Sequence, residues 1–452
     1  MNVAKIRELI ELLRQEIKKL SKDEYTVTRP TIKITNFTIS NNGSTSYSTT
    51  IVDEPVIDTL RLSPLINDIK NTPQFRDVVA EIVKTYTLPK KQQNPQAQTE
   101  FWLGSFLNKI AIDDLEGKFD ENKEVEMIMN LRNELEEGPL VHNSDMFLEG
   151  FHLETQEISL DEHVILRKPN STDIEKQISG SFGLHRGFPT IPTVVAEISR
   201  KSKEQSEIYH ENEKLLLILR LFRLGSVSAE SQAIHRSSVI WFSGTGRSSN
   251  TYKHAINNNY TIKSSDTNDL IKFYNLMKNI LPYDRQNISD RKFSSVRIAL
   301  SRYSNSLLEP VEPERRVLTS LIGLEALFTQ DGEKGETSYR LAIRIAKLLG
   351  FCGLKPMDIK NDMGKCYSIR NKVGHGLLLE EKERGDAIKY VDRLQNYLRE
   401  SIILFILCLQ EKSKGEIIDL IDKSMIDSET SVELEKWIKG KISVLPENIV
   451  VL

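Results

Sequence analysis

The distribution of proline constrains the fold of this chain more than any other feature of its sequence. The chain contains 15 prolines, but only Pro356 lies between Pro313 and Pro446. Proline disrupts the interior of a helix and is tolerated in its first turn, and Pro356 stands where a helix would begin. The last third of the chain is therefore predicted to be all helix.

Apolar residues in this last third recur at helical spacing. They predict four long helices, at about residues 314 to 330, 337 to 350, 357 to 374 and 384 to 411. The expected core residues are Val317, Leu321, Leu324 and Phe328 in the first helix, Leu341, Ile345 and Leu348 in the second, and Ala387, Val391, Leu394, Leu398 and Phe405 in the fourth. Short connections between helices of this length indicate an up-and-down four-helix bundle.

The first 300 residues mix β-branched runs with helical stretches and predict an α+β fold. Strands are expected on both sides of the hairpin signal Asn41-Asn42-Gly43, within residues 145 to 201 and at 237 to 242, helices at 63 to 88, 97 to 136 and 204 to 223, and a loop at 243 to 265. No repeat period suggests a solenoid.

The chain begins with an amphipathic helix. Val3, Ile6, Ile10, Leu13, Ile17 and Leu20 follow one another in steps of three and four. This helix either lies on its own domain or associates with a partner. We therefore expect four segments: the helix at residues 1 to 22, one or two α/β subdomains at 23 to 300 that sense or bind a ligand or protein partner, a helical bundle at 301 to 412, and short helices and a tail at 413 to 452.

Composition narrows the classes of function. The 61 basic and 64 acidic residues leave a net charge of -3, so any site for a polyanion must be local. Cys352, Cys366 and Cys408 are too few and too far apart for a disulfide framework or a zinc cage. They predict buried thiols in a reducing cytoplasm, and the N-terminus lacks the apolar stretch of a signal peptide.

The longest apolar run, Ile402 to Leu409, is about half the length that crosses a bilayer, so no membrane span is expected. Its residues are apolar on every side of the fourth helix. A small bundle cannot bury such a segment alone. Either a second copy of the chain or the N-terminal region is expected to cover it.

The third helix carries a cation among its apolar residues. At 100° per residue, Arg370 falls within the arc of Ile359, Met363 and Cys366. A buried guanidinium needs a carboxylate, a ligand or a partner subunit. Glu325, on the core-facing arc of the first helix, is the internal candidate.

His375 follows Arg370 by five residues, between Gly374 and Gly376. We expect Gly374 to end the helix and turn the imidazole toward Arg370, with Asn371 in hydrogen-bonding reach. An arginine, an amide and an imidazole at one helix end suit a phosphodiester, because the imidazole moves protons near neutral pH and the guanidinium holds phosphate. The alternative is that His375 caps the helix C-terminus.

The segment SRYSNSLLEP…LIGLEALF…SYRLAIRIAKLLG…CYSIRNKVGHG, within about residues 301 to 410, resembles the HEPN superfamily and in particular its ApeA-like branch. The matching positions are Glu325, Ser338, Tyr339, Arg340, Arg370, Asn371 and His375. The resemblance implies a four-helix bundle that forms a homodimer, so that two Arg/His motifs face one cleft. Active members are metal-independent endoribonucleases that often serve as toxins or antiviral effectors, and other members only dimerise and bind partners.

The resemblance also implies roles for individual residues. His375 would act as general base or acid, Arg370 would stabilise the charge that develops on phosphate, Asn371 would orient both, and Glu325, Tyr339 and Arg340 would support them.

The second predicted helix carries a basic stripe, formed by Arg340, Arg344 and Lys347. This stripe either contacts RNA or is a solvated face.

No cofactor or metal is expected at this site. ISGSFGLHRGFP lacks the lysine of a phosphate-binding loop, and Asp161, Glu162 and His163 lack a metal-site spacing. A metal-dependent nuclease that uses Asp161 and Glu197 is the weaker alternative.

Overall fold

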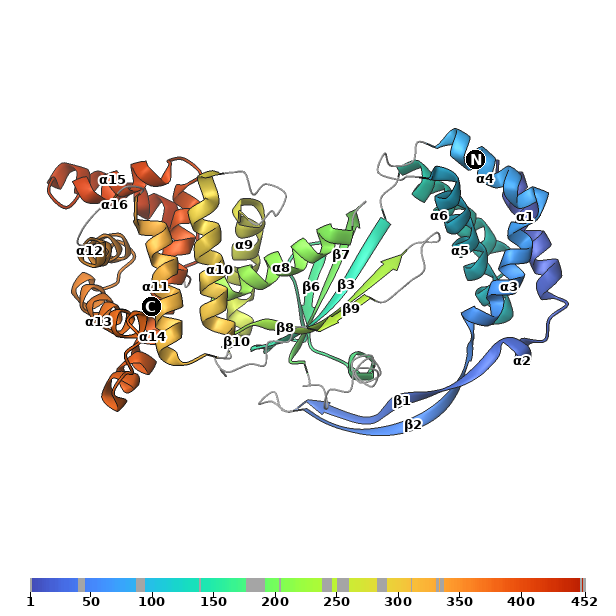
Figure 1. The fold of residues 1–452 in the computed structure, drawn as a ribbon, viewed down its shortest axis with the longest axis horizontal. Helices are drawn as coiled ribbons and strands as arrows, with labels where there is room; N and C mark the ends of the chain where they lie inside the picture. Colours follow the sequence, from blue (N-terminus) through green and yellow to red (C-terminus); the bar gives the residue numbers. More distant parts are fainter. Residues whose placement is uncertain are drawn as a thin grey trace.

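The computed structural model describes residues 2–39, 45–86, 94–137, 140–175, 192–202, 205–237, 246–249, 260–282, 291–309, 311–330, 333, 337–447 and 449. An α+β N-terminal region and a helical C-terminal region are both present (Figure 1), as the sequence predicts. The buried apolar side chains form two large cores, one in residues 2–137 and one in residues 140–449.

The first core belongs to a helical unit. Its helices are α1 (Val3–Ile17), α2 (Lys22–Tyr25), α3 (Thr59–Lys70), α4 (Pro73–Thr85), α5 (Pro95–Leu115) and α6 (Glu121–Glu137). The apolar stripe of α1, including Ile6, Ile10 and Leu13, is buried against α4 and α5. The interpretation that this helix lies on its own domain is confirmed. The helix is not a separate segment, as residues 1 to 22 were expected to be, because it shares one core with residues 57 to 131.

A long hairpin extends from this unit. Its strands are β1 (Thr26–Ile39) and β2 (Thr45–Ile57), which pair antiparallel from Thr26↔Ile57 to Ile39↔Thr45. The predicted hairpin is confirmed, and its Asn41-Asn42-Gly43 turn lies outside the described residues. In Figure 1 the two strands curve from the helices toward the sheet. There the backbone N–H of Ile34 donates to Glu175 Oε1 at 2.8 Å, which links the two parts of the chain.

The second core begins with an antiparallel sheet in the order β5-β6-β7-β3-β8-β9. These strands are β3 (Leu140–Glu149), β5 (Glu157–Ser159), β6 (Val164–Arg167), β7 (Val194–Ser202), β8 (Ser228–Ser237) and β9 (Gly246–Ser249), and β4 (Phe151–Leu153) pairs in parallel with β10 (Tyr260–Ile262). Of the strand expected at 237 to 242, Ser237 is the last described residue of β8, and residues 238 to 242 lie outside the described residues. The loop expected at 243 to 265 contains β9 and β10, and the glycine-bearing loop at 178 to 189 lies outside the described residues.

One face of this sheet packs against helix α8 (Gln205–Phe222). The sequence predicts this helix at 204 to 223. Met146 and Leu148 of β3 and Ala196 of β7 point into the large core on the α8 side. Phe147 and Val195, the intervening residues, form a small separate cluster. This period of two is expected of strands with residues on both faces of a sheet.

The C-terminal helices are α9 (Thr267–Ile280), α10 (Ser294–Leu308), α11 (Pro313–Phe328), α12 (Thr337–Gly350), α13 (Pro356–Gly374), α14 (Glu381–Cys408), α15 (Lys414–Lys423) and α16 (Ser428–Ile442). The four predicted helices are α11 to α14, and their predicted core residues are all buried. A closed four-helix bundle is not confirmed, because α10 packs on α11 and α14, and α15 and α16 pack on α12 and α14. The expected boundary at 300/301 is wrong, because it divides α10.

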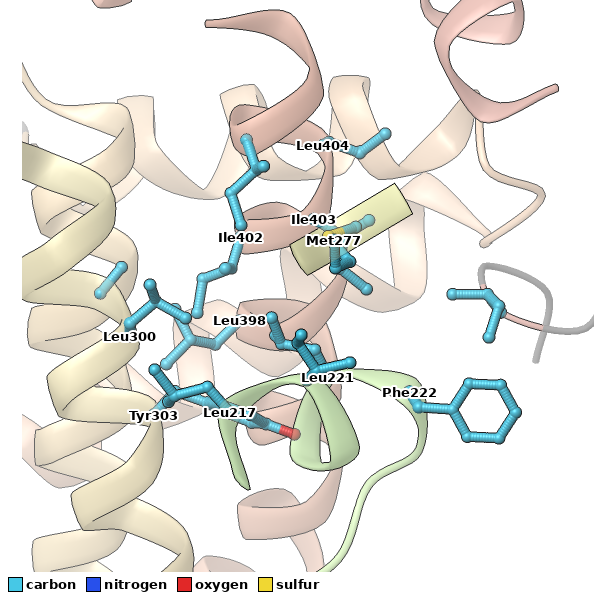
Figure 2. Close-up of a cluster of buried hydrophobic side chains, with 14 of the residues drawn as sticks. Leu217, Leu221, Phe222, Met277, Leu300, Tyr303, Leu398, Ile402, Ile403 and Leu404 are labelled. Atoms are coloured by element: carbon cyan, nitrogen blue, oxygen red, sulfur yellow. The ribbon is translucent and has the colours of Figure 1, made fainter. Parts of the chain in front are cut away.

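The sheet and these helices share one core. Figure 2 shows Leu217 and Leu221 of α8 close to Tyr303 of α10 and Leu398 of α14, and all belong to one buried cluster. Every side chain from Ile402 to Leu409 is 5% exposed or less within the single chain. The N-terminal region therefore helps to cover this run, and the run provides no argument for a dimer.

Arg399 of α14 forms hydrogen bonds across the junction between the sheet and the C-terminal helices. It donates from Nη1 to the carbonyl oxygen of Leu221 at 2.9 Å and from Nη2 to that of Ile449 at 3.0 Å. A cation at the C-terminal end of α8 satisfies carbonyl groups that the helix leaves unpaired. Arg399 thus joins α14 to α8 and to the C-terminal tail.

Glu400, the next residue, is completely buried and lies 3.6 Å from Arg399 Nη2. Asn396 Nδ2 donates to Glu400 Oε1 at 3.1 Å, and Oε2 has no hydrogen-bond partner among the described residues. Burial raises the pKa of Glu400 to about 7. Its charged form is therefore unfavourable in this junction.

Of the helices that the structure describes, none combines the length and hydrophobicity that crossing a bilayer requires.

Candidate active site

Helix α13 positions the predicted site. It begins with Pro356, whose missing N–H costs nothing in a first turn, and it ends at Gly374 with His375 as the C-cap. Gly376 has φ 73°, its N–H donates to the Val373 carbonyl at 3.0 Å, and the Leu377 N–H donates to the Lys372 carbonyl at 2.9 Å. This pair of bonds is a Schellman motif, which needs a left-handed residue where Gly376 stands. The alternative that His375 caps the helix is confirmed.

The helix does not turn His375 toward Arg370. Because α13 continues through Gly374, the two side chains remain about 140° apart around the helix axis. The expected reorientation before His375 is therefore wrong. His375 is exposed.

Asn371 is also exposed and lies on the same side of α13 as His375. Its carbonyl oxygen accepts the backbone N–H of His375 at 3.1 Å. The expected bond between the two side chains is not among the hydrogen bonds of the described residues. Asn371 and His375 therefore present an amide and an imidazole to solvent at one helix end.

Arg370 is less buried than the sequence predicts. Ile359, Met363 and Cys366 are buried, so the predicted apolar arc is correct, but the Arg370 side chain is 42% exposed. The last turn of α13 extends beyond the core, where Val373 is half-buried and Gly374 is exposed. The prediction of a sequestered guanidinium is wrong, because helical periodicity gives the direction of a side chain and not the extent of the core above it.

Glu325 of α11 faces this guanidinium. Glu325 Oε1 lies 3.7 Å from Arg370 Nη2, and the Glu325 side chain is 23% exposed. This distance is typical of an ion pair and is too long for a hydrogen bond. The Arg370 guanidinium makes no hydrogen bond with any of the described residues. The predicted pairing with Glu325 is thus present in a loose and solvated form.

Tyr367 is a site residue that the sequence analysis missed. Its hydroxyl donates to Glu325 Oε1 at 3.1 Å, and its ring is buried. Burial raises the pKa of Tyr367, so this hydroxyl remains a donor well above neutral pH. A signal for it exists in the sequence, since a tyrosine on the core face one turn before Arg370 needs a partner for its hydroxyl.

The predicted basic stripe on α12 is wrong at Arg344. The Arg344 side chain is 2% exposed and binds Glu333 at 2.5 Å and Asp422 at 2.6 Å, so it fastens α12 to neighbouring segments. Lys347 Nζ lies 2.7 Å from Ser431 Oγ, and Arg340 lies 3.6 Å from Glu333. Only Arg340 of the three is substantially exposed.

Tyr339 is exposed, and the ammonium of Lys360 lies over its ring. Ser338 is also exposed. Among the described residues, neither side chain has a hydrogen bond or ion pair with Arg370 or His375, and the contact of Tyr339 is with Lys360, near the start of α13.

The outward face of α13 carries a line of uncharged residues beside the exposed Lys365. Asn361, Gly364, Ser368 and Asn371 are exposed along it and lead to His375. A Cβ atom added at Gly364 would meet nothing within 4 Å. An elongated ligand can therefore approach His375 along this face.

Exposed leucines directly follow the same helix end. Leu377 is 59% exposed and Leu378 is 95% exposed. Lys372 and Glu383 form an ion pair that ties the end of α13 to the start of α14. Adjacent exposed leucines of this kind favour contact with another protein surface.

The two carboxylates of the alternative metal-dependent nuclease are paired with cations. Asp161 pairs with Lys278 at 2.9 Å, and Glu197 pairs with Arg167 at 2.6 Å. Among the described residues, no three His, Cys, Asp or Glu side chains are placed to hold a metal ion.

The three cysteines are free and buried, as the sequence predicts. Burial raises the pKa of Cys366 and of Cys408 to about 12, and it raises the pKa of Cys352 as well. Such thiols are poor nucleophiles, so they do not compete with the α13 residues as a reactive centre.

No family model matches the sequence, and comparisons with curated proteins and with solved structures give no significant match.

Proposed function

We propose that this chain is a metal-independent endoribonuclease of HEPN type. The observation that carries the proposal is the end of α13, where a guanidinium without a hydrogen bond among the described residues, an amide and an imidazole are accessible within one and a half helical turns. A guanidinium with unused donors binds phosphate, and an accessible imidazole serves as a general acid or base. The resemblance of the CYSIRNKVGHG segment to HEPN proteins supports the same assignment.

In the proposed reaction His375 accepts the proton of an RNA 2′-hydroxyl. The 2′-oxygen bonds to the adjacent phosphorus, the bond from phosphorus to the 5′-oxygen breaks, and the leaving oxygen takes up a proton. Arg370 stabilises the negative charge that builds up on the phosphoryl oxygens, and Asn371 orients the reacting groups. The products are a 2′,3′-cyclic phosphate and a 5′-hydroxyl.

We further propose that two copies of the chain form the active unit. Arg370 and His375 of one chain point about 140° apart, so a single chain does not direct both at one phosphate. A second copy on Leu377 and Leu378 would bury exposed apolar surface beside His375. It would also bring a second set of α13 residues to the same interface.

The proposed biological role is that of a toxin or antiviral-defence effector that acts in the cytoplasm. The α+β region would bind the ligand or protein partner that controls it. Its sheet shares a core with the C-terminal helices, which supports a direct mechanical link between recognition and cleavage.

The decisive experiment incubates the purified chain with RNA in excess EDTA and identifies the ends of the products. We expect 2′,3′-cyclic phosphate or 3′-phosphate ends, and we expect His375→Ala to reduce cutting at least about 100-fold. His163→Ala, which alters an exposed histidine of the sheet region, is the matched control and should cut normally. Undiminished cutting by a folded Arg370→Ala, His375→Ala double variant contradicts the site.

A second candidate is a non-catalytic dimerisation and interaction module. The observation in its favour is that His375 already has a structural role as the C-cap and that Arg370 already has Glu325. This alternative requires a stable dimer that cuts no RNA in any tested condition. Measurement of the mass in solution together with the EDTA assay separates the two.

A further inference from the structure

We propose that Tyr367 is a positioning residue for Arg370 and that it acts through Glu325. This inference rests on the proposed ribonuclease function, since positioning matters for a guanidinium that meets phosphate. Neither the HEPN-like motif positions nor the spacing of charged residues includes Tyr367.

The three side chains meet at one oxygen atom. Glu325 Oε1 accepts the Tyr367 hydroxyl at 3.1 Å and is the atom closest to Arg370 Nη2, at 3.7 Å. Tyr367 and Arg370 are one turn apart on α13, whereas Glu325 comes from the last turn of α11. A buried ring thus holds the carboxylate that faces the guanidinium. Without the hydroxyl, this partly solvated carboxylate is free to rotate toward water.

The length of the ion pair leaves Arg370 available. At 3.7 Å the carboxylate attracts the guanidinium but does not use its N–H donors, which need about 3.2 Å or less. Arg370 is therefore directed toward one side while its donors remain free for a phosphate.

A second arginine–carboxylate–tyrosine group, formed between α13 and α14, provides the contrast. Asp362 of α13 accepts the Tyr397 hydroxyl at 2.8 Å and Arg393 Nη1 at 3.2 Å. The same three chemical groups are present, but here the arginine is hydrogen-bonded. Tyr367 and Tyr397 are each 6% exposed, so the same substitution at both is a matched pair.

The test compares Tyr367→Phe with Tyr397→Phe in the full chain. Each change removes one hydroxyl and keeps the ring. We expect Tyr367→Phe to lower kcat for RNA cleavage about tenfold with KM within about twofold of wild type, because a displaced guanidinium stabilises the transition state less. Tyr397→Phe should leave kcat unchanged. A Tyr367→Phe enzyme with wild-type kcat overturns the proposal.

A thermodynamic cycle tests the same chain of contacts without RNA. The unfolding equilibrium constant is measured with urea for Tyr367→Phe, for Arg370→Ala and for the double variant. We expect the constant of the double variant to differ by at least about twofold from the product of the two single effects. Additive effects overturn the positioning role. If the wild-type chain cuts no RNA while the coupling is present, the proposed function fails and the Tyr367–Glu325–Arg370 contact stands.

Discussion

Arg399 and Arg370 are arginines of the C-terminal helices, each near a glutamate, yet their surroundings differ sharply. The Arg399 side chain is 7% exposed and donates to carbonyl oxygens on two other segments. The Arg370 side chain is 42% exposed and, within the described part of the chain, has one ion pair, at 3.7 Å. One guanidinium has its donors occupied by the protein, and the other keeps them free.

The difference separates two uses of the same side chain. A buried arginine must be bonded, because removing its charge from water is costly, and it then stabilises the fold. An arginine at the projecting end of a helix contributes little stability and is able to bind an anion. Substitutions at the two positions are expected to affect different measurements.

The largest effect is expected for Arg399→Ala. It removes the bonds to Leu221 and Ile449 and leaves Glu400 buried without its cation. We expect a loss of about 3 to 5 kcal/mol in the free energy of unfolding, measured with urea. Lys382→Ala, an exposed change on the same helix, should stay within about 0.5 kcal/mol. A loss below about 1 kcal/mol, which is the range of an exposed ion pair, contradicts the proposed role of Arg399 in the junction.

Glu400→Gln should have the next largest effect, and it should depend on pH. The pKa of Glu400 is raised from 4.5 to about 7, so the folded state binds more protons than the unfolded state between these values. Stability from the neutral carboxyl is complete below pH 4.5 and is lost as the pH rises through about 7. The substitution should therefore stabilise the protein by about 2 to 3 kcal/mol at pH 8 and by little at pH 4.5.

Urea unfolding of Glu400→Gln at several pH values measures this dependence. Glu381→Gln, at an exposed position of α14, is the control and should follow the wild-type profile. A variant that is less stable than wild type at pH 8 would show that the carboxylate is favourable in the junction.

The smallest effect on stability is expected for Arg370→Ala. Because its ion pair is solvated, we expect the free energy of unfolding to change by less than about 1 kcal/mol. Under the proposed function the same variant should lose RNA cleavage almost completely. Thermal unfolding and the EDTA cleavage assay on one preparation measure both, and a large loss of stability with intact cleavage would reverse the comparison.

The sequence predicts local features of this fold well. Val317, Leu321 and Leu324 recur with the period of a helix, and α11 buries all three. Pro356 and Gly374 mark the two ends of α13. Helix propensity, caps and apolar periodicity depend on residues within a few positions of one another, so a single sequence contains them.

The sequence does not show which residues far apart in the chain contact each other in the fold. The basic stripe fails at Arg344 because its partners Glu333 and Asp422 lie 11 and 78 residues away. The sequence predicts that the run from Ile402 to Leu409 needs cover beyond the bundle, but it does not decide between a second copy and the N-terminal region, which provides part of the cover through α8. At the site, Glu325 and Arg370 are predicted partners, whereas Tyr367 requires knowledge of which buried hydroxyl faces Glu325.

The core that joins the sheet to the C-terminal helices has a consequence for the modular exchange of parts. A fragment that starts at residue 301 would divide α10 and strip the apolar run of α14 of its cover, so it should be insoluble or trimmed by proteases. A fragment from residue 140 onward keeps this core whole. Recombination that grafts a new recognition module onto such a chain is thus expected to replace residues 2–137 and to retain the sheet with its helices.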